Sequence, residues 1–321
     1  MQTNLLSSLV FLVLVVLFGW LFTKAYRSHN RLLRWGGMIV TALLTLTFVL
    51  ITGVSGIGLY KLYGPHTLPK STVTIANTPQ QIARGEHIAA MFCVSCHSAN
   101  KQLPLSGGEE IGRKSPVPVG GFIPYNLTPG GPLKEWTDSE IFHALREGVD
   151  SNGRTLIAMS ALSTRRLSDE DMQAVIAYLR SQPAIERTTP EGDSPNLLFA
   201  IFLGANLVPA PVPVTGVVTA PNKGPSLEYG QYIVSFMGCG DCHGSDLAGG
   251  RSGGLAAVGP SLRVVKGWTK DQFISTIRTG NDPGGHHLDP EHMAWNIYAN
   301  MDDEELGALY LYLASLPAAQ K

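Results

Sequence analysis

The sequence predicts a mainly α protein in which two N-terminal transmembrane helices precede two small domains of the same kind. Residues 5–22 and 36–60 are strongly apolar and contain no charged side chain, which predicts the two transmembrane helices. A motif of the form Cys-x-x-Cys-His occurs twice, and the residues that follow each copy align with one another, which predicts the two domains. A chain of 321 residues is long enough for two such cores beside a membrane anchor.

Both apolar segments are long enough to cross a membrane, because about 20 helical residues span a hydrocarbon core of roughly 30 Å. The loop between them holds four basic residues, Lys24, Arg27, Arg31 and Arg34. Since positive loops remain in the cytoplasm, residues 1–62 are expected to form a two-pass anchor in a bacterial inner (cytoplasmic) membrane. Everything that follows is then periplasmic, on the extracytoplasmic side. A cleaved signal peptide is the alternative for the first segment, but no basic residue precedes that segment and no small-residue cleavage site follows it.

The charge balance excludes one class of partner. The first 60 residues contain no Asp or Glu, so the remainder carries all 25 acidic residues against 20 Lys and Arg. This outer part is mildly acidic and has no basic patch of the kind that binds phosphate groups. Nucleic acid is therefore not expected as a partner.

The four cysteines all belong to the repeated motif. They lie in Cys93-Val-Ser-Cys96-His97 and in Cys239-Gly-Asp-Cys242-His243. Cys-x-x-Cys-His is the attachment signature of c-type haem: two thiols join the vinyl groups and the adjacent imidazole binds the iron. The motifs thus predict two covalently bound haem c groups, with His97 and His243 as iron ligands. A dithiol redox site, a single Cys-only zinc site and structural disulfides are the alternatives, but the first two leave the histidines unexplained.

An internal repeat selects the second iron ligand in each domain. Residues 136–150 align with residues 268–282, with Trp, Arg and Gly in step. Beyond these segments, Met159 and Met293 each lie eight residues before an acidic helix start. A thioether ligand favours ferrous iron and raises the reduction potential, so Met159 and Met293 are the predicted ligands. The expected core methionines are Met172, Met237 and Met301, and the histidines that compete for iron are His286, His287, His292 and His143.

The helix signals give the domain boundaries. Ser168 and Asp302 are expected to cap the last helix of each domain, since carboxylates follow three residues later. We expect domain 1 at residues 78–183, a Pro-rich connection at 184–224 and domain 2 at 225–318. Within the connection, residues 208–214 favour an extended polyproline conformation. The apolar residues 197–208 are expected to pack between the two domains; docking on a membrane partner is the alternative. His87 is expected to be an ordinary surface or cap residue.

The sequence resembles the bacterial cytochrome c family, and more narrowly the cytochrome c subunit modules of membrane alcohol, aldehyde and gluconate dehydrogenases. The resemblance rests on Tyr125-Asn-Leu-Thr-Pro129, Trp136-Thr-Asp138, Arg146-Glu-Gly-Val-Asp150, Leu167-Ser-Asp-Glu-Asp171, Ala177-Tyr-Leu-Arg180, Gly259-Pro-Ser-Leu262, Arg278-Thr-Gly280, Met293-Ala-Trp295 and Tyr312-Leu-Ala-Ser-Leu316. It implies two cytochrome c-type haem domains behind the membrane anchor. It also implies that a proline carbonyl accepts a hydrogen bond from the ligand histidine, a role that Pro260 matches better than Pro124.

The sequence differs from that family in two features that bear on the identity of the redox partner. Its dehydrogenase subunits usually hold three haem modules behind a cleaved signal, and a proline commonly follows the ligand methionine, where this chain has Ser160 and Ala294. The predicted function is one-electron transfer, not catalysis, between a membrane dehydrogenase or quinol-oxidising complex and a soluble cytochrome or terminal oxidase. A dihaem subunit of a cbb-type terminal oxidase is similar in layout. A dihaem peroxidase, which needs an open iron site, is the alternative of another class; no signalling module for a haem-based sensor is visible.

Overall fold

The computed structural model describes residues 2–64, 73–112, 117–187, 193–208, 214–250 and 258–317. The chain divides into two compact units. The anchor unit comprises Met1–Pro65, Ile111–Phe122 and Asp193–Ala210, and the larger unit comprises His66–Glu110, Ile123–Gly192 and Pro211–Lys321. Most of the predicted Pro-rich run 208–214 lies outside the described residues.

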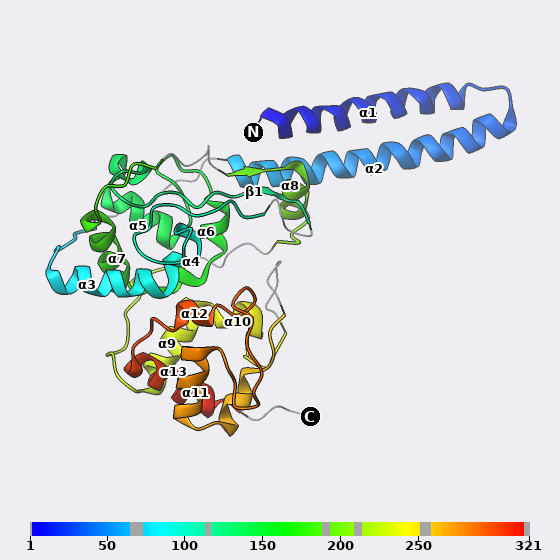
Figure 1. Cartoon of the computed structure of the whole chain (residues 1–321). Helices are drawn as coiled ribbons and strands as arrows, with labels where there is room; N and C mark the ends of the chain where they lie inside the picture. The colour runs from blue at the N-terminus through cyan, green and yellow to red at the C-terminus, as the bar shows by residue number, and fades with distance from the viewer. Residues whose placement is uncertain are drawn as a thin grey trace. The chain divides into compact units, whose positions relative to one another are not determined.

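The anchor unit is built on two long antiparallel helices, α1 (Gln2–Tyr26) and α2 (Arg31–Tyr63) (Figure 1). Asn30 begins α2, because its side chain accepts hydrogen bonds from two N–H groups of the first turn. The apolar side chains of both helices are largely exposed, and the stacked rings of Phe18 and Phe48 join them with centroids 5.6 Å apart. Both helices have the length and composition of membrane spans.

A third apolar helix, α8 (Leu197–Gly204), packs against the C-terminal part of α2. A side chain on Gly58 of α2 would lie 1.7 Å from the backbone oxygen of Ala200, and Gly204 has an equally close neighbour in α2. Only glycine allows two helix backbones to approach so closely. The expectation that residues 197–208 pack between the two repeated domains is therefore wrong, because α8 packs on α2 instead, with Phe199 and Ala200 buried.

A short strand pair completes the anchor unit. Strand β1 (Gly120–Gly121) pairs antiparallel with β2 (Ser194–Pro195), just before α8. The side chain of Asn4 donates a hydrogen bond to the carbonyl of Pro195 at 2.7 Å, which joins this pair to the start of α1. The ring of Phe122 meets that of Phe199 edge to face.

The larger unit holds two helical modules in succession. Module 1 consists of α3 (Pro79–Ile88), a π-helical turn (Ala89–Cys93), α4 (Val94–His97), a 3-10 turn (Pro132–Glu135), α5 (Asp138–Arg146), α6 (Ile157–Ala161), a second 3-10 turn (Ser163–Arg166) and α7 (Asp169–Ser181). Module 2 consists of α9 (Leu227–Met237), α10 (Cys239–His243), a 3-10 segment (Leu262–Gly267), α11 (Lys270–Thr279), α12 (Trp295–Tyr298) and α13 (Asp303–Ser315). The helix caps predicted at Ser168 and Asp302 are confirmed, since each side chain accepts a hydrogen bond from the third helical N–H group.

The first and last helices of each module cross at a glycine. A side chain on Gly85 of α3 would lie 1.9 Å from the carbonyl oxygen of Ala174 on α7. A side chain on Gly230 of α9 would lie 2.1 Å from that of Ala308 on α13. In both modules the absence of a Cβ atom lets the two helices touch backbone to backbone.

An arginine at the end of a helix holds each module in the same way. Arg146, at the end of α5, donates hydrogen bonds to the carbonyl of Arg165 and to Asp169 at the start of α7. Arg278, at the end of α11, donates to the carbonyl of Ala299 and to the carboxylate of Asp303. The predicted alignment of the two halves thus corresponds to a repeated set of contacts.

Candidate functional site

The first cysteine motif lies where α3 passes into α4. A π-helical turn that ends at Cys93 widens the helix there, and Cys96 and His97 follow in α4. The Nδ1 atom of His97 donates a hydrogen bond to the carbonyl of Tyr125 at 2.9 Å, so Nε2 is the nitrogen left for a ligand bond. The carbonyl is that of Tyr125 and not of Pro124. Burial lowers the pKa of His97, against the effect of this hydrogen bond, and the imidazole is neutral as iron ligation requires.

The second motif begins just after α9 ends. Gly238, with a φ of 71°, stops that helix and places Cys239, Cys242 and His243 in the short helix α10. The Nδ1 atom of His243 donates to the carbonyl of Pro260 at 2.7 Å, as the family resemblance implied. A Cβ atom on Gly259 would lie 2.6 Å from the same Nδ1, so the loop can reach the imidazole only because this residue is glycine.

The four thiols do not form one centre. None of the four cysteines forms a disulfide in the described part of the chain, so the disulfide alternative is not realised. Among the described residues, the only group of three or more metal-binding side chains is His87, Asp302 and Glu305, and it includes no cysteine. Burial raises the pKa of Cys93 and of Cys239 to about 12. Redox and zinc chemistry both need thiolates, whereas a neutral thioether to haem suits such apolar surroundings.

The two predicted methionine ligands lie in equivalent loops. Met159 lies in α6, and Met293 lies two residues before α12. Each loop rests on a glycine of positive φ: a Cβ on Gly148 would meet Ser160 at 2.4 Å, and one on Gly280 would meet Trp295 at 2.4 Å. Both methionines are partly exposed and pack against the core beside the cysteine-bearing helices.

Other methionines and histidines have different surroundings. The described methionines of the larger unit other than these two are buried in its core: Met91, Met172, Met237 and Met301. His287 and His292 are exposed, and their Nδ1 atoms bond to Asn281 and Asp289. His143 of α5 forms a hydrogen bond with Glu147, the residue that follows this helix. These side chains serve local structure, which leaves Met159 and Met293 as the repeated thioethers.

Orphaned polar atoms in module 1 also fit a haem. The hydroxyl of Thr164 and the Nε of Arg165 are buried and have no hydrogen-bond partner among the described residues. They follow Met159 by a few residues, and Arg165 also donates to the carbonyl of Ser160 at 3.3 Å. A haem propionate is an anion that such donors can bind, so the residues present fit the group that the motifs predict.

In each module a histidine that donates to a carbonyl through Nδ1 follows a pair of cysteines. This repeated arrangement defines a class of protein that binds haem covalently. The family model for cytochrome c matches residues 82–183 and 227–317. The chain belongs to the cytochrome c family, and its chemistry is electron transport with haem iron.

Several curated proteins are similar to most of this chain. The cytochrome c subunit of alcohol dehydrogenase (quinone) from Gluconacetobacter polyoxogenes is 30% identical over 285 residues, which cover 76% of this chain and 58% of that protein. The corresponding subunit from Gluconobacter oxydans (strain 621H) is 29% identical, with coverages of 74% and 55%. The fructose dehydrogenase cytochrome subunit of Gluconobacter japonicus is 25% identical, with coverages of 74% and 53%. The chain thus spans little more than half the length of these relatives.

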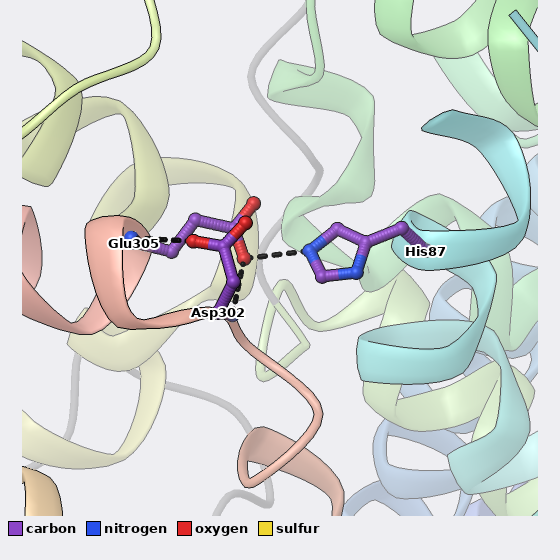
Figure 2. A group of neighbouring side chains, drawn as sticks. All are labelled: His87, Asp302 and Glu305. Atoms are coloured by element: carbon purple, nitrogen blue, oxygen red, sulfur yellow. Dashed lines mark hydrogen bonds and ion pairs between the residues drawn. The ribbon is translucent and has the colours of Figure 1, made fainter. Parts of the chain in front are cut away.

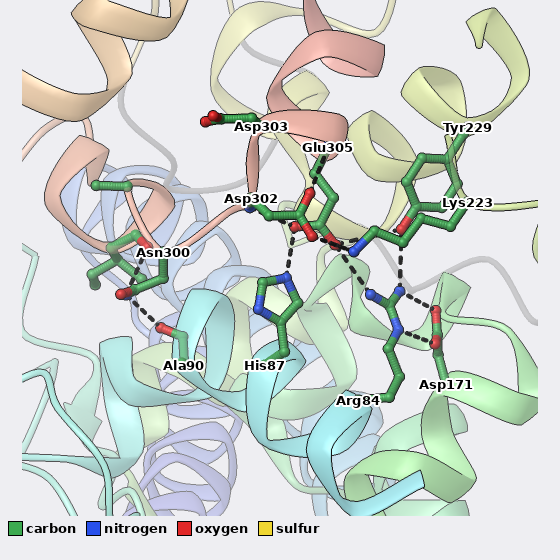
Figure 3. Close-up of polar contacts among 12 residues, drawn as sticks. Arg84, His87, Ala90, Asp171, Lys223, Tyr229, Asn300, Asp302, Asp303 and Glu305 are labelled. Atoms are coloured by element: carbon green, nitrogen blue, oxygen red, sulfur yellow. Dashed lines mark hydrogen bonds and ion pairs between the residues drawn. The ribbon is translucent and has the colours of Figure 1, made fainter. Parts of the chain in front are cut away.

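Sequence reasoning missed a polar cluster in the larger unit, which Figure 2 shows in part. His87 is not an ordinary surface residue: it is half-buried, and its Nε2 lies 2.6 Å from Oε2 of Glu305. Asp302 and Glu305 complete a group of possible metal ligands within 4.8 Å of one another. Their oxygens already pair with Lys223 and Arg84, as Figure 3 shows, so a metal ion would have to displace two cations.

Proposed function

We propose that this chain is a membrane-anchored dihaem cytochrome c that transfers electrons one at a time through two covalently bound haems. Cys93 and Cys96 would attach the first haem, and Cys239 and Cys242 the second. The iron ligands would be His97 with Met159, and His243 with Met293. The carrying observation is the repeated geometry of the two histidines: each donates to a backbone carbonyl through Nδ1, which leaves Nε2 for the iron.

The protein's part in this function is to hold and shield the iron. When bound, haem supplies an iron that changes between ferric and ferrous without bond chemistry on a substrate. The carbonyls of Tyr125 and Pro260 fix each imidazole in one orientation. The loops of Met159 and Met293 would supply the other iron ligands and exclude water, so that the ligand set would stay the same in both oxidation states. No position is then left for peroxide or oxygen.

The membrane anchor and the domain limits belong to the same proposal. Helices α1 and α2 would cross the bacterial inner membrane twice, with their basic loop in the cytoplasm and both haem modules in the periplasm. The modules would occupy residues 78–183 and 225–318, joined by residues 184–224. The absence of acidic residues before residue 61 and the apolar surfaces of both helices support this topology.

We infer that the electron donor is a membrane dehydrogenase or a quinol-oxidising complex. From this chain the electrons would pass to a soluble cytochrome or a terminal oxidase. The support is the similarity to cytochrome subunits of alcohol and fructose dehydrogenases. They give no support to an oxidase subunit or to a peroxidase. The chain would be an electron-transfer subunit rather than the catalytic one.

Purification of the native protein from its membrane in mild detergent tests this proposal. Pyridine haemochrome analysis should give two thioether-bound haems per chain, and mass spectrometry of the co-purifying proteins should identify a dehydrogenase or quinol-oxidising subunit. Fewer than two haems would refute the dihaem assignment, and a purified complex without a dehydrogenase or quinol-oxidising subunit would refute the proposed electron donor.

Replacement of Met159 by histidine tests the axial ligands. Two imidazoles stabilise ferric iron better than one imidazole and one thioether, so one midpoint potential should fall by more than about 59 mV, a tenfold change for a one-electron couple. Met293→His should lower the other potential. The control is Met172→Leu in the core of module 1, which should change neither potential in a redox titration. If Met159→His leaves both potentials in place, another residue binds that iron.

A further inference from the structure

A buried ionic cluster connects the two modules within the larger unit (Figure 3). Arg84 of α3 donates to both oxygens of Asp171 in module 1 and, through Nη1, to Glu305 of module 2 at 3.0 Å. Glu305 is only 1% exposed. It also accepts from His87, and the hydroxyl of Tyr229 lies 3.4 Å from it. Burial of so many charged groups requires that each has a partner.

The repeat shows that this cluster is symmetric. Counting from the crossing glycines of the two modules, Arg84 corresponds to Tyr229, and His87 corresponds to Tyr232. Asp171 and Glu305 correspond as well, because each is the third residue of the last helix of its module and donates its N–H to the cap residue.

Equivalent residues make equivalent contacts in both directions between the modules. His87 of module 1 bonds to Glu305 of module 2 at 2.6 Å, and Tyr232 of module 2 bonds to Asp171 of module 1 at 2.6 Å. Arg84 donates to the hydroxyl of its own counterpart, Tyr229, at 3.3 Å. Contacts in which residue i meets j while j meets i are the mark of a two-fold, isologous interface.

The same reciprocity extends to the candidate haem sites. The turn after Met159 contacts α9, and its Ser163 donates to Asp241, which lies between the two cysteines of module 2. The segment after Met293 contacts the π-helical turn that carries Cys93, and Asn300 donates to the carbonyl of Ala90 at 3.0 Å. Each methionine loop therefore touches the attachment segment of the other module.

We propose that the two modules form a pseudo-two-fold pair inside one chain, and that the cluster around Arg84, Asp171 and Glu305 positions the two haems for direct exchange of an electron. This inference rests on the proposed function, because it requires both haems. The residues of the cluster are positioning residues that act through the interface. Since electron transfer needs only that the two groups be close and fixed, reciprocal contacts between ligand loop and attachment segment supply what the exchange requires.

Glu305 and Arg84 are both expected to be charged at neutral pH, as a stable ionic contact between the modules requires. Burial alone would raise the pKa of Glu305, but the hydrogen bond from His87 and its charge lower it below the usual range. Burial likewise opposes the charge of Arg84, and Asp171 overcomes it and raises the pKa of that guanidinium. The groups that face Glu305 are Arg84 and His87 from α3, Tyr229 from α9, Lys223 from the preceding segment and Asp302 from the helix cap.

Two charge-removing variants test the proposal in the full chain with both haems attached. Glu305→Gln and Asp171→Asn change different modules at equivalent positions, whereas Glu304→Gln and Glu170→Gln change the exposed neighbours one residue earlier. Pulsed electron paramagnetic resonance of the oxidised protein measures the distribution of iron–iron distances. Exchange NMR of the half-reduced protein, extrapolated to zero protein concentration, measures the rate of electron exchange between the haems.

Both cluster variants should broaden the distance distribution and slow the exchange, each by about the same factor. We expect this factor to be on the order of tenfold, because removal of one partner leaves a buried cation partly unpaired. The two controls should match the native chain. In the native chain the narrow distribution should persist at neutral pH and be lost as the pH falls through the lowered pKa of Glu305. That acid transition should be absent in Glu305→Gln.

Several outcomes would overturn the proposal. These are unchanged exchange in both variants, an effect from only one of them, or exchange that vanishes on dilution of the native chain. If either variant loses haem, the milder pair His87→Gln and Tyr232→Phe replaces it, with the same symmetric expectation. Two attached haems with no short iron–iron distance would refute the interface and leave the proposed function intact, whereas a missing haem would refute the proposed function itself.

Discussion

Alanine at both Cys239 and Cys242 will reduce the covalently bound haem from two groups per chain to one. The remaining haem will keep the low-spin spectrum of histidine–methionine ligation, because the first site takes its ligands from module 1 alone. Pyridine haemochrome analysis, with mass measurement of the intact chain, checks both statements. Cys93→Ala with Cys96→Ala should remove the other haem and leave the second.

The control for this experiment is Ser275→Ala, which alters an exposed side chain of α11 and should leave two haems. A single metal centre shared by both cysteine pairs would give a different result. If the two cysteine pairs shared one metal centre, loss of either pair would abolish the centre as a whole. Loss of both haems from a chain that stays folded would therefore contradict two independent attachment sites.

Gly85→Val will destabilise module 1 around its haem, and Gly230→Val will do the same to module 2. The new Cβ atoms would lie 1.9 Å and 2.1 Å from carbonyl oxygens of the facing helices. The helices would have to separate, at a cost of about 3 kcal/mol or more for overpacking of this kind. Each variant should lose the low-spin spectrum of its own module at a lower denaturant concentration than the native chain does.

Gly267→Val is the matched control, because a Cβ atom there meets nothing within 4 Å. It should leave both denaturation transitions where they are. Equal transitions for Gly85→Val and the native chain would show that the crossing of α3 and α7 is not as close as the structure has it. Monitoring each haem separately is necessary, since a chain of several units does not unfold in one step.

The elements that the sequence predicts well are those fixed by neighbouring residues. The caps at Ser168 and Asp302 could be predicted because the side chain and the N–H group that it accepts from lie three residues apart. The long apolar helices and the contact between His243 and Pro260 were also predictable, the first from composition and the second from family resemblance. The π-helical turn before Cys93 left no signal in the periodicity.

The features that the sequence does not reveal depend on partners far along the chain. An apolar segment such as residues 197–208 shows that it will be covered but not by what, and Gly58 looks like any other glycine of a membrane helix. His87 appeared to be a surface residue because Glu305 lies 218 residues away. One signal was available in the repeat. Alignment of the first helices pairs His87 with Tyr232, and alignment of the last helices pairs Glu305 with Asp171, so the four residues occupy equivalent positions in the two modules.

The unequal residues at the centre of the cluster decide which modules can pair. Two copies of module 1 joined in this way would bring one Arg84 against another, and repulsion between two guanidinium groups would oppose the pairing. Two copies of module 2 would bring Tyr229 against Tyr229, and neither Glu305 carboxylate would have the guanidinium that Arg84 now supplies. Only the mixed pair places a single guanidinium between two carboxylates, those of Asp171 and Glu305. The halves of this duplicated chain have thus become a matched set, and neither can substitute for the other.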